Sequence, residues 1–222
     1  MVLEFIFRWA HVVFGVVWIG MLYYFNFVQT EYFKEAEKET ALPDAKAKLA
    51  PRALWWFRWG AMFTFLTGLI LLYMVGAHNT VAGNYSVLWV GALAGILMFL
   101  NVWLIIWPNQ KIVIASAKQV AGGGDALPGA AAALGKAGLA SRTNTLFSVP
   151  MLFFMASSVH LGQLQTSIHQ SSLVSLVVVF GLIAILALNG IFGKTGPFTS
   201  VKGVIGSGFL LTAVLYLLVE LL

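Results

Sequence analysis

Four histidines carry the most recognisable chemistry in this sequence: His11, His78, His160 and His169. His11 and His160 lie within apolar stretches, where ionisable side chains are costly and mark candidate functional positions. Neutral imidazoles from two helices at similar depth can bind the iron of a b-type haem from both faces. We therefore predict His11 and His160 as ligands of a haem iron, with His78 as a further candidate cofactor ligand.

The histidines also have simpler interpretations. Each imidazole could satisfy a hydrogen bond between helices or meet water at a membrane surface. A copper or zinc site is less favoured, because no two histidines are four residues apart on one helix and few acidic residues lie near them. The sequence has no cysteine, which excludes disulfides, thiolate metal sites and a covalently attached c-type haem.

Three arginines form a second candidate group, in which Arg52, Arg58 and Arg142 together bind an anion. The simpler interpretation of Arg58, which we favour, is a charged group that reaches the membrane surface along its aliphatic stem. The sequence contains no phosphate-binding loop, no nucleophile elbow and no zinc-protease motif. We therefore assign no catalytic residue and expect no nucleic-acid partner.

The elements that position these residues must be transmembrane helices. The chain is 60% hydrophobic and only 9% charged, whereas a soluble domain has about 25% charged residues. Crossing a bilayer takes about 20 mostly apolar residues in a helix. We predict an all-α integral membrane bundle of about six such helices, forming a single domain over residues 1–222. The predicted spans are 5–28, 54–75, 85–107, 144–162, 173–192 and 203–222.

The basic residues are concentrated at one end of this predicted bundle. Six spans place the polar loops 29–51 and 111–142 on the same side, and the connection 193–202 joins them there. Arg8 alone lies toward the other side. Since cytoplasmic loops are enriched in Lys and Arg, we expect the basic end to be cytoplasmic and both termini periplasmic, in a bacterial inner membrane. The residues on the basic side are Lys34, Lys38, Lys46, Lys48, Arg52, Lys111, Lys118, Lys136, Arg142, Lys194 and Lys202.

Two further patterns concern helix packing. Gly91 and Gly95 are four residues apart, a spacing that lets a neighbouring helix approach closely. Asn101 and Asn189 lie in apolar stretches, where we expect each amide to make a hydrogen bond between helices.

Four sequence blocks together resemble the membrane domain of bacterial membrane-bound urate oxidases. The first begins at His11 and contains Trp18-Ile19-Gly20, Tyr24, Asn26 and Gln29. The others are Pro51–Arg58, Asn101–Lys111 and Ser141–Phe154. The combination of His11 with Trp18-Ile19-Gly20 is also similar to a wider group of small helical membrane proteins, some of which bind haem b.

The resemblance implies a membrane module that transfers electrons, with haem b as cofactor. Whether the chain itself has urate oxidase-like oxidoreductase activity is left open by the resemblance. In that family a cytochrome c domain follows the membrane domain. This chain ends at Leu222 without cysteine, so we expect it to lack that domain and to pass electrons to a separate cytochrome c or another membrane or periplasmic redox subunit. A cofactor-free anchor or assembly subunit, and association into a homo-oligomer, remain open.

Overall fold

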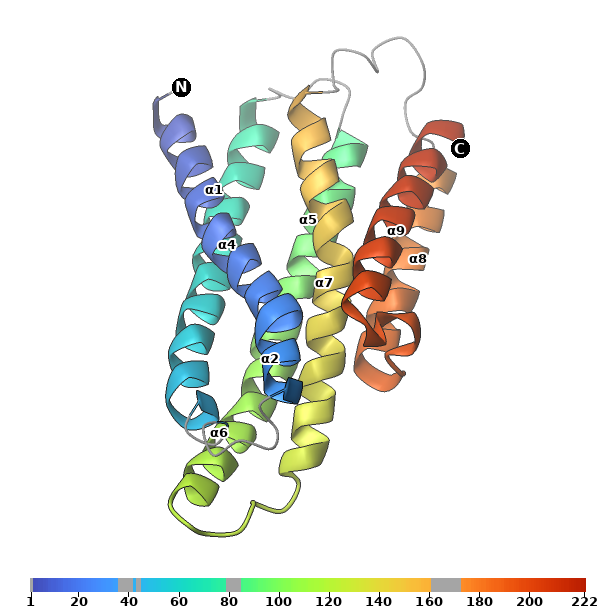
Figure 1. The fold of residues 1–222 in the computed structure, drawn as a ribbon. Coiled ribbons are helices and arrows are strands. Elements are labelled where there is room, and N and C mark those ends of the chain that lie inside the picture. The colour runs from blue at the N-terminus through green and yellow to red at the C-terminus, as the bar shows by residue number, and fades with distance from the viewer. Residues whose placement is uncertain (1, 36–41, 43–44, 79–84, 161–172) are drawn as a thin grey trace.

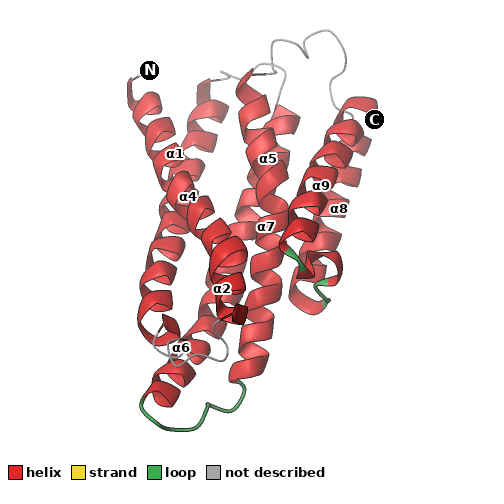
Figure 2. Ribbon diagram, viewed as in Figure 1, coloured by secondary structure: helices red, strands yellow, loops and turns green. Residues whose placement is uncertain are grey.

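A computed structural model describes residues 2–35, 42, 45–78, 85–160 and 173–222. The described part of the chain is helical and contains no strand (Figure 2). Its long helices run roughly alongside one another, and both termini lie at the same end of the bundle (Figure 1). The helical segments are α1 (Val2–Tyr23), η1 (Tyr24–Gln29), α2 (Thr30–Glu35), η3 (Ala45–Leu49), α4 (Ala50–His78), α5 (Tyr85–Leu100), η4 (Asn101–Ile106), α6 (Trp107–Ala121), α7 (Ala130–His160), α8 (Leu173–Phe192), η6 (Gly196–Thr199) and α9 (Val201–Leu221).

The predicted all-α membrane bundle is confirmed. Five helical segments are long and apolar enough to cross a bilayer: Val2–Glu35, Ala45–Met74, Val87–Ala121, Leu173–Phe192 and Val201–Leu221. Large apolar side chains remain exposed on the outside of the bundle, as expected of a surface that faces lipid tails. They include Phe5, Tyr73, Phe192 and Leu221.

The remaining long helix, α7, is central and more polar than the others. It contacts α1, α5, α6, α8 and α9. It contains residues 144–160 of the predicted span 144–162, whose last two residues lie outside the described part of the chain. Thr143, Asn144, Thr145 and Ser148 on α7 are almost completely buried. Because α7 faces other helices rather than lipid, it can carry polar side chains that bond to its neighbours.

The segment 111–142, predicted as a polar loop, is mostly helical, so that prediction was wrong. Helix α6 continues to Ala121 and α7 begins at Ala130. Only the turn between them is non-helical, where Gly123 and Gly129 adopt positive φ angles of 85° and 81°, a conformation that glycine adopts without strain. The Ala-rich stretch that begins α7 has high helix propensity. The prediction of a polar loop did not take this propensity into account.

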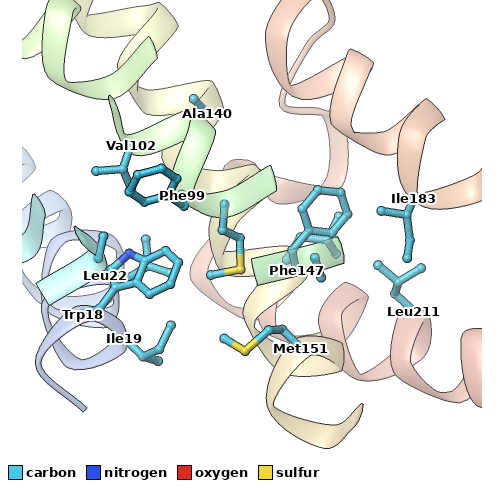
Figure 3. Close-up of a cluster of buried hydrophobic side chains, with 14 of the residues drawn as sticks. Trp18, Ile19, Leu22, Phe99, Val102, Ala140, Phe147, Met151, Ile183 and Leu211 are labelled. Carbon is cyan, nitrogen blue, oxygen red and sulfur yellow. The ribbon is translucent and has the colours of Figure 1, made fainter. Parts of the chain in front are cut away.

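Close helix packing at Gly91 is confirmed. A Cβ atom on Gly91 would lie 3.2 Å from the backbone nitrogen of Met155, so α5 and α7 approach closely there. Apolar side chains from several helices complete the core around α7. Figure 3 shows Trp18 and Phe99 on one side of this core, and Phe147, Ile183 and Leu211 meeting on the other.

This contact gives a stability prediction. Gly91→Leu should destabilise the bundle by about 1–3 kcal/mol, because the added side chain overfills a closely packed interface. Gly135→Leu on α7 is the matched control, since a Cβ there meets nothing within 4 Å. Thermal unfolding in detergent measures both variants. An equal loss of stability in the two would contradict the packing role of Gly91.

Candidate functional site

His11 is held by hydrogen bonding at the interface between α1 and α4. Its Nδ1 atom lies 3.1 Å from Oγ1 of Thr67. Oγ1 of Thr67 also lies 2.7 Å from the carbonyl oxygen of Phe63 and 3.0 Å from that of Thr64, both on its own helix. A hydroxyl has one hydrogen to donate. Donated to either carbonyl, it would make Thr67 the acceptor for an N–H at Nδ1 of His11 and would assign the lone pair of the ring to Nε2.

Glycine makes room for this imidazole. A Cβ atom on Gly68 would lie 3.0 Å from Cε1 of His11, closer than ordinary packing allows. The ring also makes a hydrogen bond to the backbone of Thr64. A metal-bound histidine usually donates its other ring N–H to a neighbouring oxygen, which sets the tautomer and orients the ring. His11 is therefore a residue whose ring is oriented by neighbouring oxygens and that could hold a cofactor.

The structure does not join the other histidines to His11. His160 is the last residue of α7 and is exposed. His78 is the last residue of α4, and its side chain, like all of His169, lies outside the described residues. The described residues contain no cluster of three or more His, Asp or Glu side chains that could hold a metal ion. The haem ligand pair thus stays a prediction.

The three arginines of the predicted anion site lie in different surroundings. The Arg58 guanidinium stacks over the Trp107 ring at 3.7 Å from its centroid, an attraction between a cation and an aromatic face. Arg52 is exposed on α4. Arg142 is buried on α7, with only 7% of its surface exposed. No described contact links the three, and Arg142 alone is removed from solvent.

A buried polar layer crosses the bundle at the level of Arg142. The Nδ2 atom of Asn101 donates to Oδ1 of Asn144 at 2.8 Å, and Nδ2 of Asn144 donates to the Met98 carbonyl at 2.9 Å. Three residues earlier on α7, Nδ2 of Asn26 donates to Oγ of Ser141 at 2.8 Å. The interhelical bond predicted for Asn101 is confirmed. We call Asn26, Gln29, Asn101, Ser141, Arg142 and Asn144 the inner polar layer.

Two π-helical segments supply half of this layer. Asn26 and Gln29 lie on η1, and Asn101 begins η4. Both segments contact α7. A π-helical turn inserts an extra residue into a helix and is found frequently at functional sites. These turns were not predicted, although an asparagine lies within an apolar stretch at both positions.

The interhelical bond predicted for Asn189 is wrong. Its Nδ2 atom donates to the carbonyl oxygen of Lys194 at 3.3 Å, just beyond the end of its own helix. An asparagine close to a helix end can satisfy the free carbonyl groups there, so it needs no partner on another helix.

Two buried atoms of the inner polar layer have no hydrogen-bond partner within the described residues. They are Nη1 of Arg142 and Oε1 of Gln29. The carboxylate of Glu31 attracts the Arg142 guanidinium electrostatically. The ion pair that Glu31 forms in the described structure, however, is with Lys34, at 2.8 Å. Arg142 is thus a buried cation without a bonded counter-charge in the described structure.

Comparison with known proteins gives one match. A family model described as "Urate oxidase N-terminal" matches residues 73–190, more than half of the chain. The matched region contains α5, η4, α6 and α7, and with them Asn101, Ser141, Arg142 and Asn144. His11 and Thr67 precede it. No curated protein and no solved structure matches this chain.

Proposed function

The chain belongs to the urate oxidase N-terminal family, and from this premise we propose that it is a membrane electron-transfer module that binds haem b and passes electrons toward a cytochrome c. The observation that carries the proposal is the contact between Nδ1 of His11 and Oγ1 of Thr67. An N–H at Nδ1 donated to the Thr67 hydroxyl would orient the ring and leave Nε2 as the nitrogen that could bind iron.

The residues proposed to hold the haem are His11 and His160, with His78 as a substitute for either. Bound haem b would supply a one-electron carrier within the apolar bundle. The protein's own part is to orient the His11 ring through Thr67 and Gly68 and to exclude water with the α1 and α4 side chains. The electron donor is proposed to be urate, a quinol or a partner subunit.

The competing function is a cofactor-free membrane anchor or assembly subunit. The exposed position of His160 at the end of α7 favours it, because a haem ligand pair needs two imidazoles inside the bundle. A reduced-minus-oxidised spectrum of the purified protein separates the two functions. A b-type spectrum supports the electron-transfer module, whereas a folded, colourless protein supports the anchor.

The proposed orientation places the basic end in the cytoplasm of a bacterial inner membrane. Lys46, Lys111, Lys118 and Lys136 lie in segments at the end of the bundle opposite the termini (Figure 1). Basic residues near the ends of membrane spans are retained on the cytoplasmic side. A cytochrome c partner would then meet the end that carries His160 and both termini.

This orientation predicts the activity of alkaline phosphatase fusions, since the enzyme is active only outside the cytoplasm. Fusion within the turn 122–129 should give an inactive reporter. Fusion after Leu222 should give an active one and serves as the matched control. Strong activity from the turn, with none from the C-terminus, would reverse the proposed orientation.

A further inference from the structure

An apolar groove runs along the outside of the bundle, with α7 as its floor. One wall is the end of α1 with η1, and the other is the first half of α9, so that α7 lies between the two walls (Figure 1). The groove has a volume of about 420 Å³, within the roughly 300–1,000 Å³ of pockets that hold small organic molecules. Its lining on α7 extends from Thr145 to Phe153, about 12 Å at a rise of about 1.5 Å per residue.

The groove opens toward the surface that faces lipid. At its floor, a Cβ atom on Gly208 would lie 2.8 Å from Cγ2 of Val149, so α9 and α7 approach closely there. Higher in the groove, Leu152 and Phe209 line it and are exposed. A molecule that fills the groove can therefore enter it from the bilayer.

The hydroxyl groups in the lining are already bonded within the protein. Thr145 and Thr212 each donate to a carbonyl oxygen one turn earlier on their own helices, at 3.0 and 2.8 Å. The Tyr23 hydroxyl lies 2.9 Å from Oγ of Ser148 on α7. The described residues that line the groove include no charged side chain. An apolar chain suits this lining better than a quinone ring, whose buried carbonyl oxygens would need hydrogen-bond donors.

A lysine lies at one end of the groove. Lys202 precedes the lining residues Ile205 and Phe209 by three and seven positions on α9, a spacing that puts all three on one helix face. Lys202 is exposed, and the described residues form no ion pair with it. The sequence has no acidic residue between Asp125 and Glu220. Helices α7 and α8 and most of α9 therefore carry positive charge only.

We propose that the groove binds one acyl chain of an anionic phospholipid whose phosphate group contacts Lys202. The length of the lining on α7 is close to half the thickness of a hydrocarbon core of about 30 Å, so the site belongs to a single leaflet. The chain supplies the dispersion contacts that an empty groove would lack, and the ammonium group attracts the phosphate. The site uses neither the histidines nor haem, so this proposal and the proposed function can fail separately.

Native mass spectrometry of the full chain in detergent measures the lipid that stays bound. The probes are dioleoyl phosphatidylglycerol and dioleoyl phosphatidylcholine, which have the same chains and differ in the net charge of the headgroup. Phosphatidylglycerol should bind roughly fivefold more tightly, because one lysine near the phosphate favours the anionic lipid. Equal binding of the two lipids, or binding of neither, would overturn the proposal.

Filling the groove tests where the chain binds. Leu152→Trp places a large ring in the groove and should remove the bound phospholipid. Leu188→Trp on α8 is the matched control, since Leu188 is exposed and lies outside the lining, and it should retain the lipid. If Leu152→Trp leaves phospholipid binding unchanged and instead abolishes a dimer or removes a bound quinone, the groove belongs to that occupant and the proposal is wrong.

Lys202→Gln tests the headgroup contact without altering the groove. Phosphatidylglycerol should then bind no more tightly than phosphatidylcholine, whose binding should be unchanged. Lys118→Gln, which removes an exposed charge from α6, should keep the roughly fivefold preference. Loss of the preference in both variants would indicate a response to net charge alone and would contradict a contact at Lys202.

Discussion

Replacing His11 by alanine is expected to abolish the b-type difference spectrum while the protein still folds. His11 is half-buried between α1 and α4, and its Nδ1 atom lies 3.1 Å from the Thr67 hydroxyl oxygen. His11 is one of the two residues that would hold the haem, so its removal would leave the proposed site incomplete. The reduced-minus-oxidised spectrum, normalised to folded protein, measures the effect.

Thr67 provides the control that separates ligation from packing. Thr67→Val keeps the shape of the side chain but removes the acceptor for Nδ1, so it should weaken haem binding by about 10–100-fold. Thr67→Ser keeps the hydroxyl and should retain the wild-type spectrum. If Thr67→Val and Thr67→Ser behave alike, the hydrogen bond does not orient the ring for a cofactor.

The second large effect is expected at Asn144. This residue is completely buried and connects α7 to Asn101 and to the Met98 carbonyl through both of its amide atoms. Asn144→Leu leaves two buried groups without partners, at about 1–3 kcal/mol for each. We therefore expect destabilisation of about 2 kcal/mol or more in a detergent unfolding titration.

Two comparisons test this explanation. The double variant Asn101→Leu/Asn144→Leu should recover part of the stability lost in Asn144→Leu, because it also removes the Asn101 amide that has lost its partner. Asn189→Leu should have little effect, since that amide bonds near the surface at the end of its own helix. A loss of stability in the double variant that exceeds the sum of the losses in the two single variants would contradict the pairing.

The sequence predicted the features that follow from hydropathy and residue size. A long apolar run must be helical in a bilayer, so the all-α bundle followed from composition alone. Gly91 was recognised as a close-approach site because four-residue spacing puts small residues on one helix face. Asn101 was recognised as a bonding residue because an amide inside an apolar stretch needs a partner.

Features that depend on neighbouring helices were harder to predict. The polar side chains of α7 are explained by its central position, which no single helix reveals. The π-helical turns at Asn26 and Asn101 leave the apolar pattern almost unchanged. The acceptor for His11 lies 56 positions away along the chain. Likewise, the sequence positions of Arg52, Arg58 and Arg142 did not indicate that Arg142 would be the buried one of the three.

The most direct test of the central claim is the amount of haem b per protein, measured by the pyridine haemochrome assay on purified wild type and on the four single His→Ala variants. We predict haem in the wild type, its loss or strong reduction in His11→Ala and His160→Ala, and little change in His169→Ala. His78→Ala reports whether that residue substitutes for either ligand. A haem-free, folded wild type, or full haem content in both His11→Ala and His160→Ala, would contradict the assignment.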